Sequence, residues 1–257
     1  MFSVQQRDDV RDRILELARS DPRIVAGAIV GSLALGGGDR FSDLDLTFGV
    51  SAAAGVIDVL DDWTVRLRQE LDALPLVDLG RDATTYRVFL LPDLLQVDLS
   101  MTPATAFRPA GPRFRLLFGE TAPPGAAEPG GAPARIAIPT AALAPDLFGW
   151  GVVYALHARA CIERGRTWQA EHYVGAVRDH ALSLSCLRQG LVAVQARGYD
   201  DLPPQTLANF ENTHVGALDG GALRAALAAS VRALMSEGAA AGLRDAAAIA
   251  ARLAELS

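Results

Sequence analysis

The sequence predicts an α+β protein, with a small mixed β-sheet and helices in its first half and an all-helical bundle in its second half. Short apolar runs of strand length, separated by Gly, Pro and Asp, recur up to residue 101. Beyond a stretch of Pro, Gly and Ala, apolar residues recur only at helical spacing. We therefore expect a sheet domain at 1–120, a linker at 121–139 and a helical domain at 140–257.

The first half is expected to contain, in chain order, a helix, two strands, a helix and two strands, at residues 7–20, 24–30, 44–50, 52–74, 84–91 and 94–101. Asp21-Pro22 ends the first helix, because the residue before a proline is disfavoured in helical conformation, and Pro75 is expected to stop the second. The sheet should have five strands or fewer. The arginine-rich segment 102–120 reads as a loop that either binds a phosphate or base, or only connects.

The second half is expected to contain five helices, at residues 145–164, 167–197, 204–214, 221–237 and 242–256. Its two cysteines, Cys161 and Cys186, lie in apolar helical segments without zinc-binding spacing, so we expect both to be small buried side chains.

The balance of acidic and basic residues indicates which kinds of binding partner are expected. The chain has 30 acidic residues and 24 basic residues, all of them arginine, for a net charge of −6. This balance argues against a nucleic-acid polymerase, which needs a basic track for the backbone, so no nucleic-acid partner is expected. No signal peptide and no membrane-spanning run is present. We expect a cytoplasmic protein without a membrane partner; its oligomeric state is not predicted.

The most informative motif joins the first two predicted strands. Gly31-Ser32 follows the apolar run 24–30, and Asp43-Leu44-Asp45 begins the next. Residues two apart on a strand point to the same side, so both carboxylates should face one way, close enough to share a Mg²⁺ ion. The glycine permits close backbone approach, and the turn offers N–H groups and a hydroxyl to a phosphate.

A third acid, Asp98, lies in the short apolar strand 94–101. An ionised carboxylate among leucine and valine is costly to bury unless it is paired or bound to a metal. We therefore expect Asp98 to lie beside the acid pair on a neighbouring strand.

Together, Gly31-Ser32, the Asp43-x-Asp45 pair and the later Asp98 resemble the signature of the DNA polymerase beta-like nucleotidyltransferase superfamily. The resemblance implies transfer of a nucleoside monophosphate, AMP from ATP, to a hydroxyl of a small molecule, with two Mg²⁺ ions. It implies that Asp43 and Asp45 bridge both ions and that Asp98 completes the acceptor-side ion. Gly31 and Ser32 would hold the β- and γ-phosphates.

One position departs from the superfamily pattern. Leu35 stands before Gly36 where many relatives carry an arginine. The source of positive charge on the phosphates is therefore left open by the sequence.

The helical segment that begins at residue 167 carries a possible acceptor site. Glu171, Gly175 and Arg178 share a face by three- and four-residue steps, and the glycine leaves a gap between opposite charges. The layout resembles kanamycin and lincosamide nucleotidyltransferases, whose helical domain walls the acceptor site. It implies an aminoglycoside-like acceptor, with Glu171 or, failing that, Asp98 as general base, and with Arg178 and Trp168 on the acceptor side. The alternative is a solvated polar stripe.

Two further interpretations stay open. Arg166 and His172 loosely resemble the Arg-x(4–6)-His pattern of HEPN ribonucleases, whose helical domains accompany nucleotidyltransferases in toxin–antitoxin pairs. This suggests an antitoxin-like regulator that adenylylates a protein partner. A nucleotide-binding module without turnover is the other, and the intact set of three acids argues against it.

Overall fold

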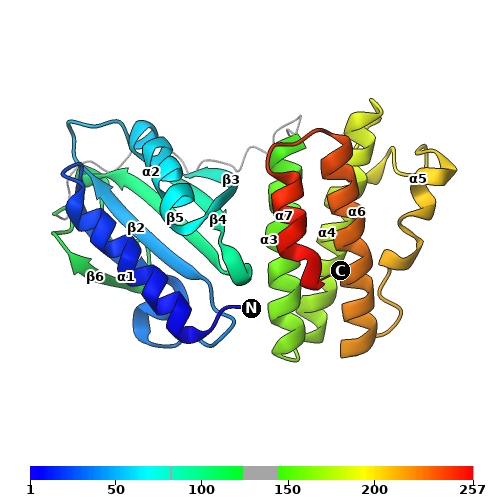
Figure 1. The fold of residues 1–257 in the computed structure, drawn as a ribbon, viewed down its shortest axis with the longest axis horizontal. Helices are drawn as coiled ribbons and strands as arrows, with labels where there is room; N and C mark the ends of the chain where they lie inside the picture. The colour runs from blue at the N-terminus through cyan, green and yellow to red at the C-terminus, as the bar shows by residue number, and fades with distance from the viewer. Residues whose placement is uncertain (82, 124–143, 257) are drawn as a thin grey trace. The chain divides into compact units, whose positions relative to one another are not determined.

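The computed structural model describes residues 1–81, 83–123 and 144–256. The chain divides into two compact units, Met1–Ile138 and Pro139–Ser257 (Figure 1). The predicted linker at 121–139 lies mostly outside the described residues. The predicted α+β class is confirmed: a mixed sheet with helices is followed by a helical region.

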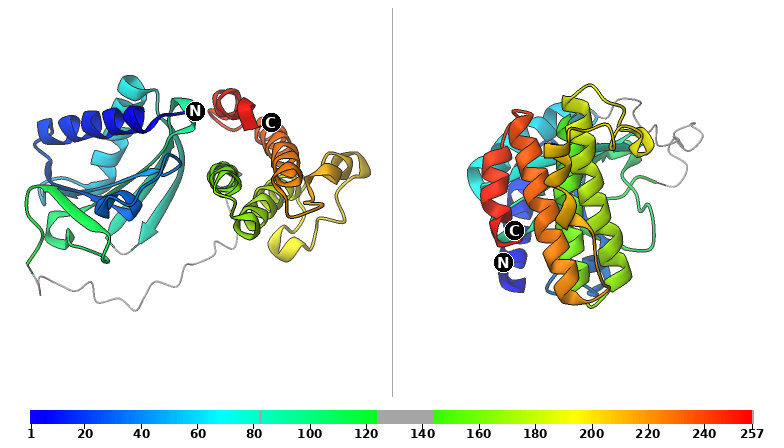
Figure 2. Two further views of the ribbon diagram at one scale, coloured as in Figure 1. Left: turned by 90° about the horizontal axis from the view of Figure 1, so that it is seen from below. Right: turned by 90° about the vertical axis from the view of Figure 1, so that its right-hand side faces the viewer.

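The first unit is a six-stranded sheet with two long helices on one of its faces (Figures 1 and 2). The strand order is β3-β4-β5-β2-β1-β6. The strands β2 and β5 run parallel, and every other neighbouring pair is antiparallel. The elements are α1 (Val4–Ser20), β1 (Ile24–Val30), β2 (Leu44–Val50), α2 (Val56–Leu71), β3 (Leu74–Arg81), β4 (Thr84–Leu90), β5 (Gln96–Pro103) and β6 (Phe114–Phe118), with a 3₁₀ helix at Gly31–Leu35.

The two central strands show why the acids gather on one side. Along β2 and β5, alternate residues are fully buried in the core beneath the helices, where they pack around Trp63 of α2 and Ile14 of α1. The residues between them face the other way, and we call that side of the sheet the open face. The core-facing residues are Leu44, Leu46, Phe48 and Val50 on β2 and Val97, Leu99 and Met101 on β5.

The edge strand β3 corrects the predicted helix 52–74. The helix α2 ends at Leu71, Asp72 adopts a left-handed conformation with φ of 51°, and the chain then forms β3 from Leu74. Pro75 therefore lies in a strand rather than ending a helix. An edge strand tolerates proline because one row of its backbone groups needs no partner, and the register with β4 shifts between Pro75 and Val77.

The opposite edge strand, β6, corrects the predicted loop at 102–120. Residues Phe114–Phe118 pair antiparallel with β1, with Phe114 opposite Val30. The arginines obscured the strand signal, although Arg115 is simply one of its two solvent-exposed residues, with Leu116. The sheet consequently has six described strands, one more than the largest number expected.

The second unit is built on three long helices, α3 (Ala144–Glu163), α4 (Thr167–Arg188) and α6 (Gly220–Ala240), which pack against one another. The predicted helix 167–197 ends earlier, because Gly190 turns the chain with φ of 71°. The predicted helices 204–214 and 242–256 are shorter, as α5 (Pro204–Ala208) and α7 (Ala246–Leu253). Cys161 and Cys186 are buried and free, as expected.

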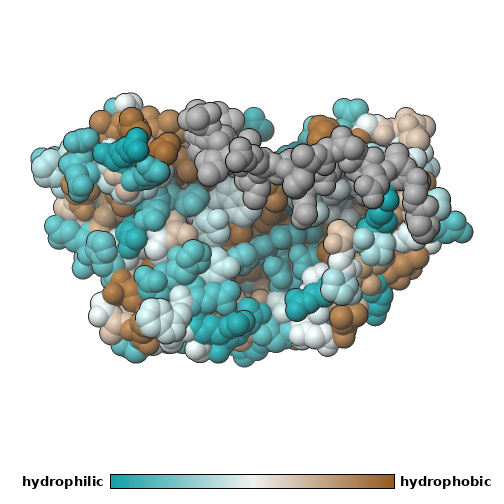
Figure 3. Space-filling model, turned by 180° about the vertical axis from the view of Figure 1, so that it is seen from behind, coloured by the Kyte–Doolittle hydropathy of each residue, from teal (hydrophilic) through white to brown (hydrophobic). Residues whose placement is uncertain are grey.

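No described helix is both long and apolar enough to cross a bilayer. On the face drawn in Figure 3, hydrophobic side chains form separate small groups among hydrophilic ones.

Candidate metal and nucleotide site

Three carboxylates meet on the open face of the sheet. One oxygen each of Asp43, Asp45 and Asp98 lies within 4.8 Å of the others, and all three residues are partly buried. We call these residues the acid triad. They are the only group of three or more potential metal-ligating residues among the described parts of the chain.

Strand pairing brings the triad together. Asp45 on β2 and Asp98 on β5 are direct partners in the parallel register. Asp43 precedes β2 by one residue and lies two residues before Asp45, so the backbone alternation turns it to the same side. Residues more than fifty positions apart in the sequence thereby come into contact range.

Two features of the structure favour glycine at position 31: the backbone conformation there and the nearby side chain of Asp45. Gly31 has a φ of 67°, a left-handed conformation that favours glycine. A side chain at this position would also collide with the carboxylate of Asp45. The end of β1 and the acid triad are thus in direct contact.

Ser32 follows as part of the short 3₁₀ helix Gly31–Leu35. Its Oγ is buried and has no hydrogen-bond partner. A buried hydroxyl without a partner is uncommon and costs about 1–3 kcal/mol. The hydroxyl therefore has a hydrogen-bonding capacity that no described residue satisfies.

The triad is electrostatically strained in the absence of a cation. Burial, followed by the charges of Asp43 and Asp98, raises the pKa of Asp45 to about 8. Burial and the charge of Asp43 raise the pKa of Asp98 to about 7, although a hydrogen bond from Gln96 opposes this rise. Both carboxyls therefore lose their protons at a higher pH than an ordinary aspartate does.

These residues fit a Mg²⁺ site. The donors are all carboxylate oxygens, the ligand type that Mg²⁺ prefers, and three carboxylates within 4.8 Å of one another concentrate negative charge that a divalent cation would neutralise. The orphaned Ser32 Oγ adds a buried polar atom nearby in the chain.

Gln96 was not singled out from the sequence. Its Nε2 donates to Asp98 Oδ1 at 2.9 Å, and its side chain is buried. It lies two residues before Asp98 on β5, so it shares the open face. That spacing was visible in the sequence, but a glutamine at a strand end carries no signal by itself.

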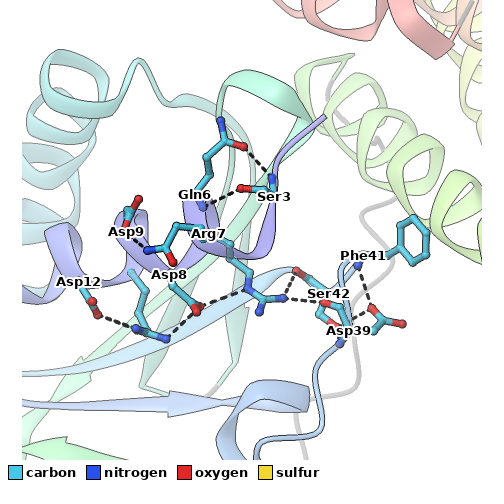
Figure 4. A network of polar contacts seen from close by, with 11 residues as sticks. Ser3, Gln6, Arg7, Asp8, Asp9, Asp12, Asp39, Phe41 and Ser42 are labelled. Atoms are coloured by element: carbon cyan, nitrogen blue, oxygen red, sulfur yellow. Dashed lines mark hydrogen bonds and ion pairs between the residues drawn. The ribbon is translucent and has the colours of Figure 1, made fainter.

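Arg7 was also missed. This arginine of α1 is only 4% exposed, and its Nη1 donates to the carbonyls of Asp39 at 2.7 Å and Ser42 at 3.4 Å. Figure 4 shows its side chain reaching from α1 to the loop that leads into the acid triad. The loop is closed by hydrogen bonds between Ser42 and Asp39. Arg7 therefore holds the segment immediately before Asp43.

The source of positive charge on the phosphates stays open, because Leu35 carries none and the nearest arginine along the chain is Arg40. Leu35 is 70% exposed. Arg40 lies five residues further on and stacks over the ring of Phe41 at 4.6 Å.

The helical unit carries Glu171 on α4. The helix begins at Thr167 and has no acidic residue in its first turn, so Glu171 lies beyond the reach of the helix N-terminus. Its side chain is partly buried and makes no hydrogen bond or ion pair with the described residues. Its role as general base stays a prediction.

The two acceptor-side candidates on α4 differ in their surroundings. Arg178 pairs with Asp179 at 3.1 Å and approaches His214 at 3.5 Å, and its guanidinium lies against Gly175. The gap expected above that glycine is thus taken up by Arg178 itself. Trp168 is 76% exposed.

Comparison with known proteins adds little. No protein-family model matches the sequence, and no curated protein matches it. A crystal structure of an aminoglycoside 6-adenyltransferase from Bacillus subtilis aligns with 99% of this chain and 92% of that chain, at 11% identity and a TM-score of 0.32. A TM-score this low carries no argument, so the geometry of the acid triad must support any functional proposal.

Proposed function

We propose that this protein is a Mg²⁺-dependent nucleotidyltransferase that transfers AMP from ATP to a hydroxyl of a small molecule. The observation that supports this is the convergence of the acid triad from β2 and β5 beside the Gly31-Ser32 turn. Carboxylates that gather on neighbouring central strands, two of them with raised pKa values, are more typical of a functional site than of a structural one.

The roles of the residues follow from their placement. Asp43, Asp45 and Asp98 would hold the magnesium, which when bound neutralises phosphate charge and aligns the reacting groups. The Gly31-Ser32 turn would receive the β- and γ-phosphates, with Ser32 Oγ donating to a phosphate oxygen.

In the reaction, the acceptor hydroxyl oxygen forms a bond to the α-phosphorus. The bond between that phosphorus and the oxygen bridging to the β-phosphate breaks, and pyrophosphate leaves. The hydroxyl proton goes to a base, for which Glu171 is the candidate, because its carboxylate has no partner among the described residues. Positioning and charge neutralisation account for most of the rate enhancement in such transfers.

The test is transfer of label from ATP carrying ³²P at the α-position, with a panel of hydroxyl compounds that includes aminoglycosides and lincosamides. We expect label on a small molecule only with Mg²⁺ present, and none with Asp98→Asn. The matched control is Asp9→Asn, an exposed acid on α1, which should transfer normally. Label on a co-expressed protein would favour the adenylylating regulator, and normal transfer by Asp98→Asn would refute the proposed site.

A further inference from the structure

A cavity of about 420 Å³ lies on the open face of the sheet, beside the acid triad. Its floor is formed by side chains of three neighbouring strands: Thr47 on β2, Ser100 and Thr102 on β5, and Tyr86 on β4. Residues of the connection between β5 and β6, including Arg108 and Arg113, also line it, as do Val30, Thr84 and Phe114.

The cavity is next to the acid triad along the strands β2 and β5. Thr47 and Ser100 are partners in the β2–β5 register, one pleat beyond the Asp45–Asp98 pair on the same face. Two residues of strand span roughly 7 Å. Tyr86 is the partner of Ser100 on the other side. A row of hydroxyls therefore runs across the sheet next to the row that carries the acids.

The lining has a definite chemical character. The hydroxyls of Thr47, Tyr86 and Thr102 make no hydrogen bond with any described residue. Arg108 and Arg113 both line the cavity, and no aspartate or glutamate does so among the described residues. Arginine pairs well with phosphate and carboxylate groups. In a chain with more acids than bases, this lining is suited to an anion.

We propose that this cavity is the acceptor subsite and that the acceptor is a hydroxyl compound carrying a phosphate or carboxylate group. The proposal rests on the proposed nucleotidyl transfer. The acidic group would lie near Arg108 and Arg113, and the reacting hydroxyl would point toward the acid triad. A polycationic aminoglycoside would bring its charge against two arginines, so the acceptor belongs to a different class from the one that the sequence resemblance implied.

The experiment is an NMR titration of the full chain without nucleotide or metal, followed through backbone amides and arginine Nε–H groups. The probes are glycerol 3-phosphate for the phosphate arm, glycerate for the carboxylate arm, and glycerol as the neutral match. We expect at least one anion to bind about tenfold more tightly than glycerol and to shift the signals of Thr47 and Arg113. Arg113→Gln should lose that advantage.

The control is Arg115→Gln, which removes an exposed arginine of β6 that does not line the cavity and should leave anion binding unchanged. Equal binding of glycerol and both anions, or an equal loss with Arg115→Gln, would overturn the acceptor subsite.

A separate titration with Mg²⁺ and a non-hydrolysable ATP analogue keeps the two proposals apart. Shifts at Gly31 and Ser32 without any anion response in the cavity would leave the transferase proposal intact and refute the subsite alone. Anion binding without a nucleotide response would refute the transferase and with it the acceptor role. Loss of nucleotide affinity in Arg113→Gln would show that the arginines bind the nucleotide rather than the acceptor, and would overturn the proposal.

Discussion

Asp45 and Asp98 face each other as direct register partners on the parallel strands β2 and β5. The two carboxylates are partly buried, and Asp43 adds a third charge within 4.8 Å. Burial, and after it the neighbouring carboxylate charges, chiefly that of Asp43, raise the pKa of Asp45 to about 8 and that of Asp98 to about 7. The free energy of unfolding should therefore depend on pH and on whether a metal ion is bound to the acid triad.

The first prediction concerns that linkage. Folding raises both pKa values above the ordinary carboxyl value of 3.8, so the folded state binds more protons than the unfolded state between about pH 4 and 8. The free energy of unfolding of the metal-free protein should therefore fall as pH rises through that window. Thermal denaturation in EDTA at several pH values measures this. A stability that rises steadily from pH 5 to 8 would contradict it.

Asp45→Asn should relieve the repulsion. We expect the metal-free variant to be more stable at pH 8 by on the order of 1–3 kcal/mol, since each unit of pKa shift corresponds to about 1.4 kcal/mol. Mg²⁺ should raise the melting temperature of the natural chain, because it binds the folded state alone, and should not raise that of the variant. An equal Mg²⁺ response in both proteins would show that the ion binds elsewhere.

The second prediction separates backbone strain from collision at Gly31. Gly31 and Gly36 have similar left-handed φ values of 67° and 73°, but only a side chain at position 31 would strike Asp45, while nothing lies within 4 Å at position 36. Gly36→Ala should cost only the conformational strain of about 1–2 kcal/mol. Gly31→Ala should cost more and also weaken Mg²⁺ binding. Chemical denaturation and metal titration of both variants provide the comparison. Equal losses of stability and of Mg²⁺ affinity in the two variants would contradict the contact between position 31 and Asp45.

The third prediction concerns Arg7. Arg7→Met keeps the apolar volume but leaves the carbonyls of Asp39 and Ser42 without their donor, so we expect a loss of about 2–4 kcal/mol in unfolding free energy. Because the loop leads into Asp43, apparent Mg²⁺ affinity should weaken as well. Arg11→Met, which removes only surface ion pairs, should cost no more than about 1 kcal/mol. A destabilised Arg7 variant with unchanged Mg²⁺ affinity would limit this residue to a purely structural role.

The fourth prediction concerns acid stability. Asp21 accepts hydrogen bonds from Arg23 and, at 2.9 Å, from the indole of buried Trp63, and these partners lower its pKa to about 2. A depressed carboxyl pKa contributes stability above the ordinary value of 3.8 that is lost as pH falls toward 2. Asp21→Asn should cost about 1–2 kcal/mol at pH 7 and much less near pH 2. Urea denaturation at both pH values tests this, and a loss that is equal at the two would contradict it.

The fifth prediction concerns Glu171. If this carboxylate takes the acceptor proton, Glu171→Gln should lower the transfer rate by about 10²–10⁴ and leave Mg²⁺–nucleotide binding unchanged. Asp179→Asn on the same helix, which removes a partner of Arg178, is the comparison for a merely structural change. A normal rate in Glu171→Gln would exclude it as the base and make Asp98 the next candidate.

The local features of the site can be predicted from the sequence alone. The glycine–serine turn after β1, the two aspartates at the start of β2 and the acid within β5 were all predicted, because strand alternation and turn chemistry act between near neighbours. The α+β class followed in the same way from the change in apolar periodicity.

The full strand order and the register of each pair are visible only in the folded chain: the sequence predicts Asp98 on a strand next to the acid pair, but not which residue it faces. Nothing local to Asp45 or Asp98 states that they are partners, because that depends on pairing across the whole sheet. The edge strands β3 and β6 were missed since an edge accepts proline and arginine, which weaken the strand pattern. The buried side chain of Arg7 and the hydroxyl-lined cavity likewise arise from residues that are distant in sequence and meet only when the chain packs.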